Sequence, residues 1–114
     1  MTKERFKDVR EQLNAACEKL LEQKGKEYTR GQDDRLANFK GIAEQMNTTP
    51  LLVWYIFFYK HIDAIAYYIS HEDIALSESI DSRIMDARNY LDLLYALLHE
   101  ETAEEPCLDS QSKK

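Results

Sequence analysis

The chain has 114 residues, of which 44% are hydrophobic and 32% are charged. This balance is typical of one soluble globular domain, and only three Gly and two Pro leave little material for turn-rich β architecture. The formal net charge of −6 argues against a face that neutralises a phosphate backbone, so nucleic-acid duplexes are not expected partners. Composition therefore predicts an all-α protein.

The N-terminal residues, the cysteine spacing and the longest apolar run predict where in the cell the protein is found. Residues 1–7 lack the apolar core of a signal peptide, and Cys17 and Cys107 show no C-x-x-C spacing. The longest apolar run, residues 51–59, stops at Lys60, well short of the roughly 20 residues needed to cross a bilayer. We expect a cytoplasmic protein with reduced thiols and no membrane partner.

The first half of the chain predicts two helices. In residues 2–24 apolar side chains recur at steps of three and four, which marks one face of a helix. Gly25 weakens the end of that helix, and residues 24–34 read as the connection that follows. A second helix is predicted over residues 34–46, with an aspartate at 33 or 34 as its cap.

A third helix is predicted from Pro50 to about residue 70. Thr49 can accept hydrogen bonds from the first free N–H groups, and Pro50 at the first helical position loses none. The first half of this helix is apolar almost all round, so neighbours must cover it on several sides. The pattern predicts either a central position in the fold or a subunit interface.

The last helix is predicted over residues 78–101, with Ser77 as its cap. The apolar residues expected to be buried are Ile80, Ile84, Leu91, Leu94, Tyr95 and Leu98. Residues 103–114 are polar and predict a disordered tail, which leaves residues 1–102 as a single helical domain. The predicted fold is thus a bundle of about four helices, completed by homo-oligomerisation into a homodimer or homotetramer.

Carboxylates on the last helix are the strongest candidates for chemistry, because zinc spacings and phosphate-binding glycine loops are absent. Glu78 and Asp81 are three residues apart and can converge on one Mg²⁺, with Asp86 and Asn89 extending the polar strip. The alternative is that the first two acids complement the helix dipole, while Asp86 pairs with one of the arginines at 83 and 88 on a solvated face.

Three further polar side chains lie among apolar neighbours. Asn89 is expected to be partly buried, so it needs a partner, either a neighbouring helix or a ligand. Lys60 can contact a phosphate or pair with a carboxylate of the last helix. His61 is either a satisfied core or interface histidine or the edge of a site, and the aromatic side chains around it are core residues or stack on a base.

Four segments of the sequence resemble a known group of proteins: "LLEQKGKEY" at 20–28, "DRLANF" at 34–39, "YKHIDAI" at 59–65 and "ESIDSRIMDARNYL" at 78–91. In this order they resemble small phage and prophage proteins related to the MazG-like all-α nucleotide pyrophosphohydrolases. The resemblance covers about residues 18–98. It implies a helical bundle assembled as a dimer or tetramer that holds Mg²⁺ against a nucleoside triphosphate.

The resemblance also implies roles for individual residues. It makes Asp86 and Lys60 catalytic, and Glu78, Asp81 and Asp86 ligands of Mg²⁺ or neighbours of those ligands. Five residues are expected to contact the nucleotide, some because of the resemblance and some because they are polar groups among apolar neighbours. They are Tyr28, Asn38, Lys60, His61 and Asn89. The chain departs from the family because residues 50–70 hold no glutamate pair and offer only Asp63, so Glu18, Glu22 or Glu27 would have to substitute.

Three functional hypotheses follow. The first is a phage-type nucleotide-handling enzyme that uses Mg²⁺ to release pyrophosphate from a nucleoside triphosphate. The second is a protein that sequesters a nucleotide without turnover, for example a signalling nucleotide of a host defence system. The third is a helical interaction module without a ligand, in which the aromatic helix is a dimer interface and the polar residues set its register.

Overall fold

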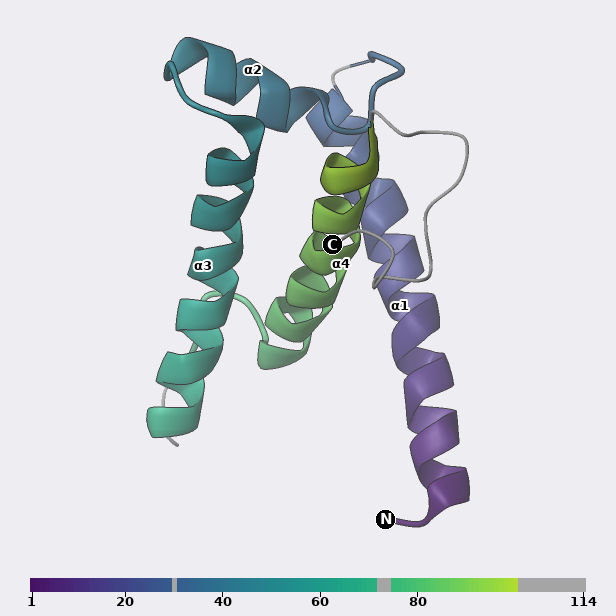
Figure 1. Ribbon diagram of the computed structural model, residues 1–114. Helices are drawn as coiled ribbons and strands as arrows, with labels where there is room; N and C mark the ends of the chain where they lie inside the picture. The colour runs from purple at the N-terminus through teal and green to yellow at the C-terminus, as the bar shows by residue number, and fades with distance from the viewer. Residues whose placement is uncertain (30, 72–74, 101–114) are drawn as a thin grey trace, which may run out of the picture.

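The computed structural model describes residues 1–29, 31–71 and 75–100, which form four helices and no strand. The helices are α1 (Lys3–Thr29), α2 (Ala37–Gln45), α3 (Pro50–Ser70) and α4 (Ile80–His99). α4 packs between α1 and α3, and α2 crosses one end of the bundle against α3 and α1 (Figure 1). The predicted all-α bundle is confirmed. The predicted tail at 103–114 lies outside the described residues. Among the described residues, no helix is both long and apolar enough to cross a membrane.

α1 is longer than predicted, because it continues through Gly25 to Thr29. Gly25 is buried, and a Cβ there would lie 3.0 Å from Nε of Arg35. The glycine therefore makes room for the Arg35 side chain instead of ending the helix, a tertiary contact that outweighs the low helix propensity of glycine. The extension carries Tyr28 along the same helix as Lys24.

The turn between α2 and α3 fixes where α3 begins. Asn47 has a φ of 57°, and Thr48 N–H donates to the carbonyl of Ala43 at 2.9 Å, which is a left-handed C-cap that ends α2. The hydroxyl of Thr49 then accepts from Leu52 N–H at 3.2 Å, and Pro50 follows as the first helical residue. The predicted start of the third helix is confirmed.

The second and fourth helices begin a few residues later than the sequence predicts. α2 begins at Ala37, because the Asp34 carboxylate accepts from Leu36 N–H at 2.9 Å and holds a turn there. The cap of α4 is Ser79, whose hydroxyl accepts from Ser82 N–H at 3.1 Å, and the prediction of Ser77 was wrong by two residues. Glu78 consequently precedes the helix.

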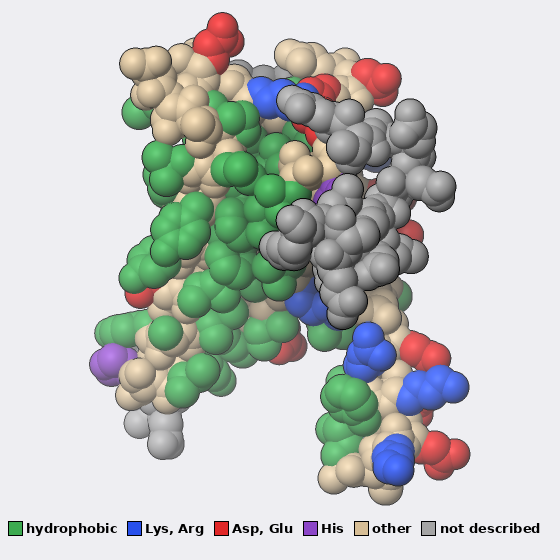
Figure 2. Space-filling model, viewed as in Figure 1, with side chains coloured by type: hydrophobic (Ala, Val, Ile, Leu, Met, Phe, Trp, Pro, Cys, Tyr) green, Lys and Arg blue, Asp and Glu red, His purple; other side chains and the backbone are tan. Residues whose placement is uncertain are grey.

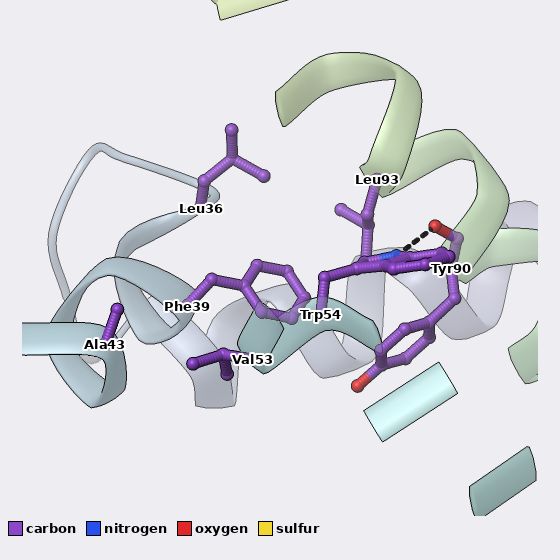
Figure 3. Packing of buried hydrophobic residues seen from close by; sticks show 7 residues of the cluster. All are labelled: Leu36, Phe39, Ala43, Val53, Trp54, Tyr90 and Leu93. Carbon is purple, nitrogen blue, oxygen red and sulfur yellow. Dashed lines mark hydrogen bonds between the residues drawn. The ribbon is translucent and has the colours of Figure 1, made fainter. Parts of the chain in front are cut away.

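The core lies where α2, α3 and α4 meet. Its buried side chains are Leu36, Phe39, Ala43, Val53, Trp54, Tyr90 and Leu93 (Figure 3). Trp54 Nε1–H donates to the carbonyl of Tyr90 at 2.6 Å, which satisfies the indole and joins α3 to α4. The Phe39 ring meets the edge of the Tyr90 ring at 6.0 Å between centroids. This core holds α3 and α4 in one register and so fixes the polar residues beside it.

The predicted buried face of the last helix was wrong in most positions. Ile84, Leu91, Tyr95 and Leu98 are 38%, 51%, 39% and 57% exposed. The buried side of α4 instead carries Asp86, Ala87, Asn89, Tyr90 and Leu93. Because the helix is apolar on two sides, periodicity alone could not identify the side that meets α1 and α3.

Candidate functional site

A buried ion pair lies at the centre of the candidate site. Lys24 of α1 places its ammonium 3.0 Å from Oδ1 of Asp86 in α4, and the Asp86 side chain is only 2% exposed. Burial lowers the pKa of Lys24, but its hydrogen bond and charge interaction with Asp86 outweigh that effect and the net shift is upward. A buried carboxylate needs such a partner, since an unpaired charge is costly there.

His61 is neutral in this environment. Burial is the main cause of its lowered pKa, and the charges of Arg83 and Lys24 act in the same direction against Asp86. Nη1 of Arg83 lies 3.3 Å from Nδ1 of His61, and because a guanidinium can only donate, Nδ1 is the acceptor and the proton lies on Nε2. The 3.8 Å separation from Asp86 Oδ2 is therefore not an ion pair.

Above this centre lies a cavity of about 480 Å³, which we call the cationic pocket. All four helices contribute to it, with Glu78 from the segment before α4. Its lining side chains are Lys24, Glu27, Tyr28, Asn38, Ile42, Phe57, Lys60, His61, Glu78, Arg83 and Tyr90. Lys24 is already paired with Asp86, so Lys60 and Arg83 are the other two cations of this lining, which also contains two glutamates.

Two polar atoms in this lining are buried without a hydrogen-bond partner among the described residues. They are Oδ1 of Asn38 and Nε of Arg83. Buried polar groups are normally satisfied, so this acceptor and this donor each lack, within the described part of the chain, the partner that such groups usually have. The Tyr90 hydroxyl is also held as a neutral donor, because burial raises its pKa to about 12.

A second cavity of about 180 Å³ adjoins the first, and we call it the neutral pocket. The two share Tyr28, Asn38 and Ile42. The remaining lining of the neutral pocket is Thr29, Gln32, Ala37, Gly41 and Gln45, so no described residue around it carries a charge. A Cβ on Gly41 would meet nothing within 4 Å, which leaves this side of the pocket open.

The structure brings together four of the five residues predicted at the ligand. Tyr28, Asn38, Lys60 and His61 all line the cationic pocket, although they come from three different helices. Lys60 is exposed at the rim, with its ammonium 5.9 Å from the centre of the Phe57 ring. These residues can meet one small molecule at the same time.

Asn89 lies elsewhere. Its amide is 5% exposed and donates to the carbonyl of Cys17 at 2.9 Å, so it joins α4 to α1. It does not line the cationic pocket. The observed contact is the structural hydrogen bond to a neighbouring helix that the sequence left open as the alternative to a ligand role.

The three predicted metal ligands are not grouped. No three described His, Cys, Asp or Glu side chains form a cluster that could hold a metal ion. Glu78 lines the pocket, Asp81 is exposed outside it, and Asp86 is buried against Lys24. Helical spacing predicted convergence of residues 78 and 81, but α4 begins only at Ile80, so that geometry does not apply to them.

Sequence reasoning missed two cationic residues of the site. Lys24 was assigned to the end of a helix, and nothing local indicates its pairing with Asp86. Arg83 was interpreted only as a surface partner for an acid. Its spacing held a usable signal, because Arg83 precedes Tyr90 by seven residues and therefore lies on the same side of α4.

Comparison of the chain with protein-family models, with curated proteins and with solved structures gives no match. The likeness to MazG-like pyrophosphohydrolases therefore rests on the sequence motifs alone.

Proposed function

We propose that this protein binds a nucleotide, with the phosphates in the cationic pocket and the base in the neutral pocket. The observation that carries this proposal is the joining of the two cavities at Asn38, whose buried Oδ1 has no described partner. A nucleotide has the same division into an anionic end and an uncharged, hydrogen-bonding ring. The larger cavity, about 480 Å³, is within the range of ordinary small-molecule sites.

The phosphate end is supported by donors of different kinds. Arg83 offers its unpartnered Nε–H and a guanidinium that suits phosphate oxygens in pairs. Lys60 adds a mobile charge at the rim, and the Nε2–H of His61 is a neutral donor. Because Lys24 already forms an ion pair with Asp86, we do not propose it as the main contact to the phosphates.

The base end is supported by an amide and by a ring. Asn38 can donate from its NH₂ and accept at Oδ1, the pair of functions that a base edge complements. Tyr28 lines both pockets and offers a ring face on which a base can stack. The uncharged neutral pocket accommodates a heterocycle without placing a charge against it.

A second candidate function is Mg²⁺-dependent hydrolysis of a nucleoside triphosphate to a monophosphate and pyrophosphate. The observation in its favour is that Glu27 of α1 and Glu78 both line the cationic pocket. Mg²⁺ in nucleotide sites is commonly held by one or two carboxylates together with the substrate phosphates. Glu27 is also one of the glutamates that could replace the missing pair on α3. Glu27 and Glu78 would hold the ion, which would supply charge screening of the phosphates and a more acidic water.

Thermal melting with each common nucleoside triphosphate, with and without Mg²⁺, tests both proposals, with pyrophosphate assayed in the same samples. A melting shift without product supports binding alone. A shift that requires Mg²⁺ and comes with pyrophosphate supports the enzyme. If no nucleotide shifts the melting temperature, both proposals fail and the ligand-free interaction module remains.

Paired variants separate the two functions further. Glu27→Gln with Glu78→Gln removes the carboxylates from the pocket but keeps its cations, so it abolishes turnover by the enzyme and leaves or strengthens metal-free binding. Lys60→Gln weakens nucleotide binding by about tenfold in either case, since hydrogen bonds to charged groups contribute roughly 1.5 kcal/mol or more. Lys60 is exposed, so the fold is not expected to change.

A further inference from the structure

α3 has the composition of a core helix but lies largely on the surface. Among its 21 residues only Lys60 and Asp63 belong to the four charged types, against 32% of the whole chain. Only Val53 and Trp54 of this helix are buried. Large apolar side chains exposed at this density are unusual for a surface that faces water.

A stripe of exposed apolar residues follows each of two packed helices. Among the exposed apolar side chains of α3, one stripe consists of Leu51, Tyr55, Ile62 and Ile69, and on α4 the stripe consists of Ile84, Leu91 and Leu98. Within each helix these residues are four or seven positions apart, which is about one or two helical turns, so each set lies on one side of its helix. We call these seven residues the α3–α4 apolar face.

The two stripes belong to one surface. Leu51 of α3 and Leu98 of α4 line the same hollow of about 350 Å³. Figure 2 shows hydrophobic side chains spread continuously over α3 and across to α4. The side chains of the cationic pocket on these helices, among them His61 and Arg83, occupy other positions of the helical wheel, so the face is separate from the candidate site.

We propose that a second copy of this chain covers the α3–α4 apolar face, as an isologous homodimer. The exposed fractions of its seven side chains correspond to roughly 600 Å² of apolar surface, comparable with the ~800 Å² that each partner of a standard interface buries. Leu52, Ile56, Tyr59 and Tyr67 continue the surface round α3 and are 47%, 52%, 55% and 47% exposed. The whole area is larger than a typical monomer exposes.

The charge of the protein favours a second copy over a membrane as the occupant. Surface-bound amphipathic helices carry Lys and Arg beside their apolar side, which anionic lipids attract. Here the chain has a net charge of −6, and α3 offers a single lysine. An isologous contact needs no further complementary surface, since the same apolar patch serves both partners.

Sedimentation velocity of the full chain over about 1 to 100 μM tests the proposal, since standard interfaces of ~1,600 Å² begin at micromolar affinity and this face is somewhat smaller. The variant Tyr55→Lys with Leu91→Lys places two charges on the face. Phe6→Lys is the matched control, because Phe6 of α1 is 55% exposed, as Tyr55 is, but lies off the face. Circular dichroism checks that each variant keeps its helices.

We expect dimers for the wild type and for Phe6→Lys, and an at least tenfold weaker dimer for the double variant. A wild type that stays monomeric at every concentration overturns the proposal, as does a double variant that dimerises like the wild type. Hydroxyl-radical footprinting of the wild type measures the solvent exposure of individual side chains and needs no substitutions. Leu51, Ile62 and Leu91 become protected as concentration rises, and unchanged labelling at these residues contradicts the assigned face.

Discussion

The ammonium of Lys24 lies 3.0 Å from the carboxylate of Asp86, which is 62 residues away in the sequence. This contact ties α1 to α4 directly beneath the cationic pocket. Asp86 is 2% exposed, whereas Lys24 keeps 30% of its side chain in solvent. The pair therefore consists of a fully buried carboxylate and an ammonium at the edge of the solvent.

Lys24→Met should destabilise the protein by about 2 to 3 kcal/mol, because it leaves the Asp86 charge buried without its partner. The double variant Lys24→Met with Asp86→Leu should recover most of that loss, since neither charge is then buried. Urea unfolding measures both changes. A single variant as stable as the wild type would show that Asp86 is satisfied by other groups.

His61 should make the protein sensitive to acid. Burial, with the nearby cations, holds its folded pKa below the ordinary 6.5, so the unfolded state binds more protons between those two values. Stability is therefore full above about pH 6.5 and falls as the pH drops toward the folded pKa. His61→Gln should flatten this dependence in urea unfolding measured at several pH values. His71→Gln is the control, because the His71 ring is exposed, and an equal effect of both variants would contradict the account.

Ser79 and Ser77 provide a matched test of where α4 begins. Ser79→Ala removes the hydroxyl that accepts from Ser82 N–H, so it should cost about 1 kcal/mol. Ser77→Ala should change stability by less than about 0.5 kcal/mol, as surface substitutions away from such features do. Thermal unfolding compares the two. A larger loss for Ser77→Ala would restore the start predicted from the sequence.

Gly41 allows the neutral pocket to be filled without disturbing the core. Gly41→Ala should stabilise α2 by up to about 1 kcal/mol, since alanine is the better helix former and its Cβ meets nothing. Gly41→Phe should occupy the pocket and weaken binding of a nucleoside triphosphate about tenfold or more, because the base loses its contacts.

Inorganic tripolyphosphate is the control ligand for Gly41→Phe, because it has the phosphates and no base. Its affinity should be the same in the wild type, Gly41→Ala and Gly41→Phe. Calorimetric titration measures each pair. If the phenylalanine weakens both ligands equally, or neither, the base does not occupy the neutral pocket.

The helices could be predicted where their signals are local. Thr49 and Pro50 start α3 in the structure as they do in the sequence pattern, because both act within one helical turn. Gly25 was misread for the opposite reason. Its effect depends on Arg35, ten residues later, which occupies the space that a Cβ would need.

The site could be predicted only in part, since it is assembled from distant segments. Lys60 and His61 were identified because polar groups in an aromatic helix are locally conspicuous. The pairing of Lys24 with Asp86 has no local signal, and it engages the carboxylate to which the resemblance assigned a metal-binding role. The exposed side of α4 was mistaken for its core because both sides are apolar.

The most direct test of nucleotide binding compares two arginines of α4 by calorimetric titration with a nucleoside triphosphate. Arg83 lines the cationic pocket, whereas Arg88 donates to Asn14 Oδ1 at 2.8 Å away from it. The account predicts that Arg83→Gln weakens binding about tenfold or more, through the loss of a charge-assisted hydrogen bond, while Arg88→Gln binds like the wild type. Equal affinities for the two variants, or no binding by the wild type, would contradict it.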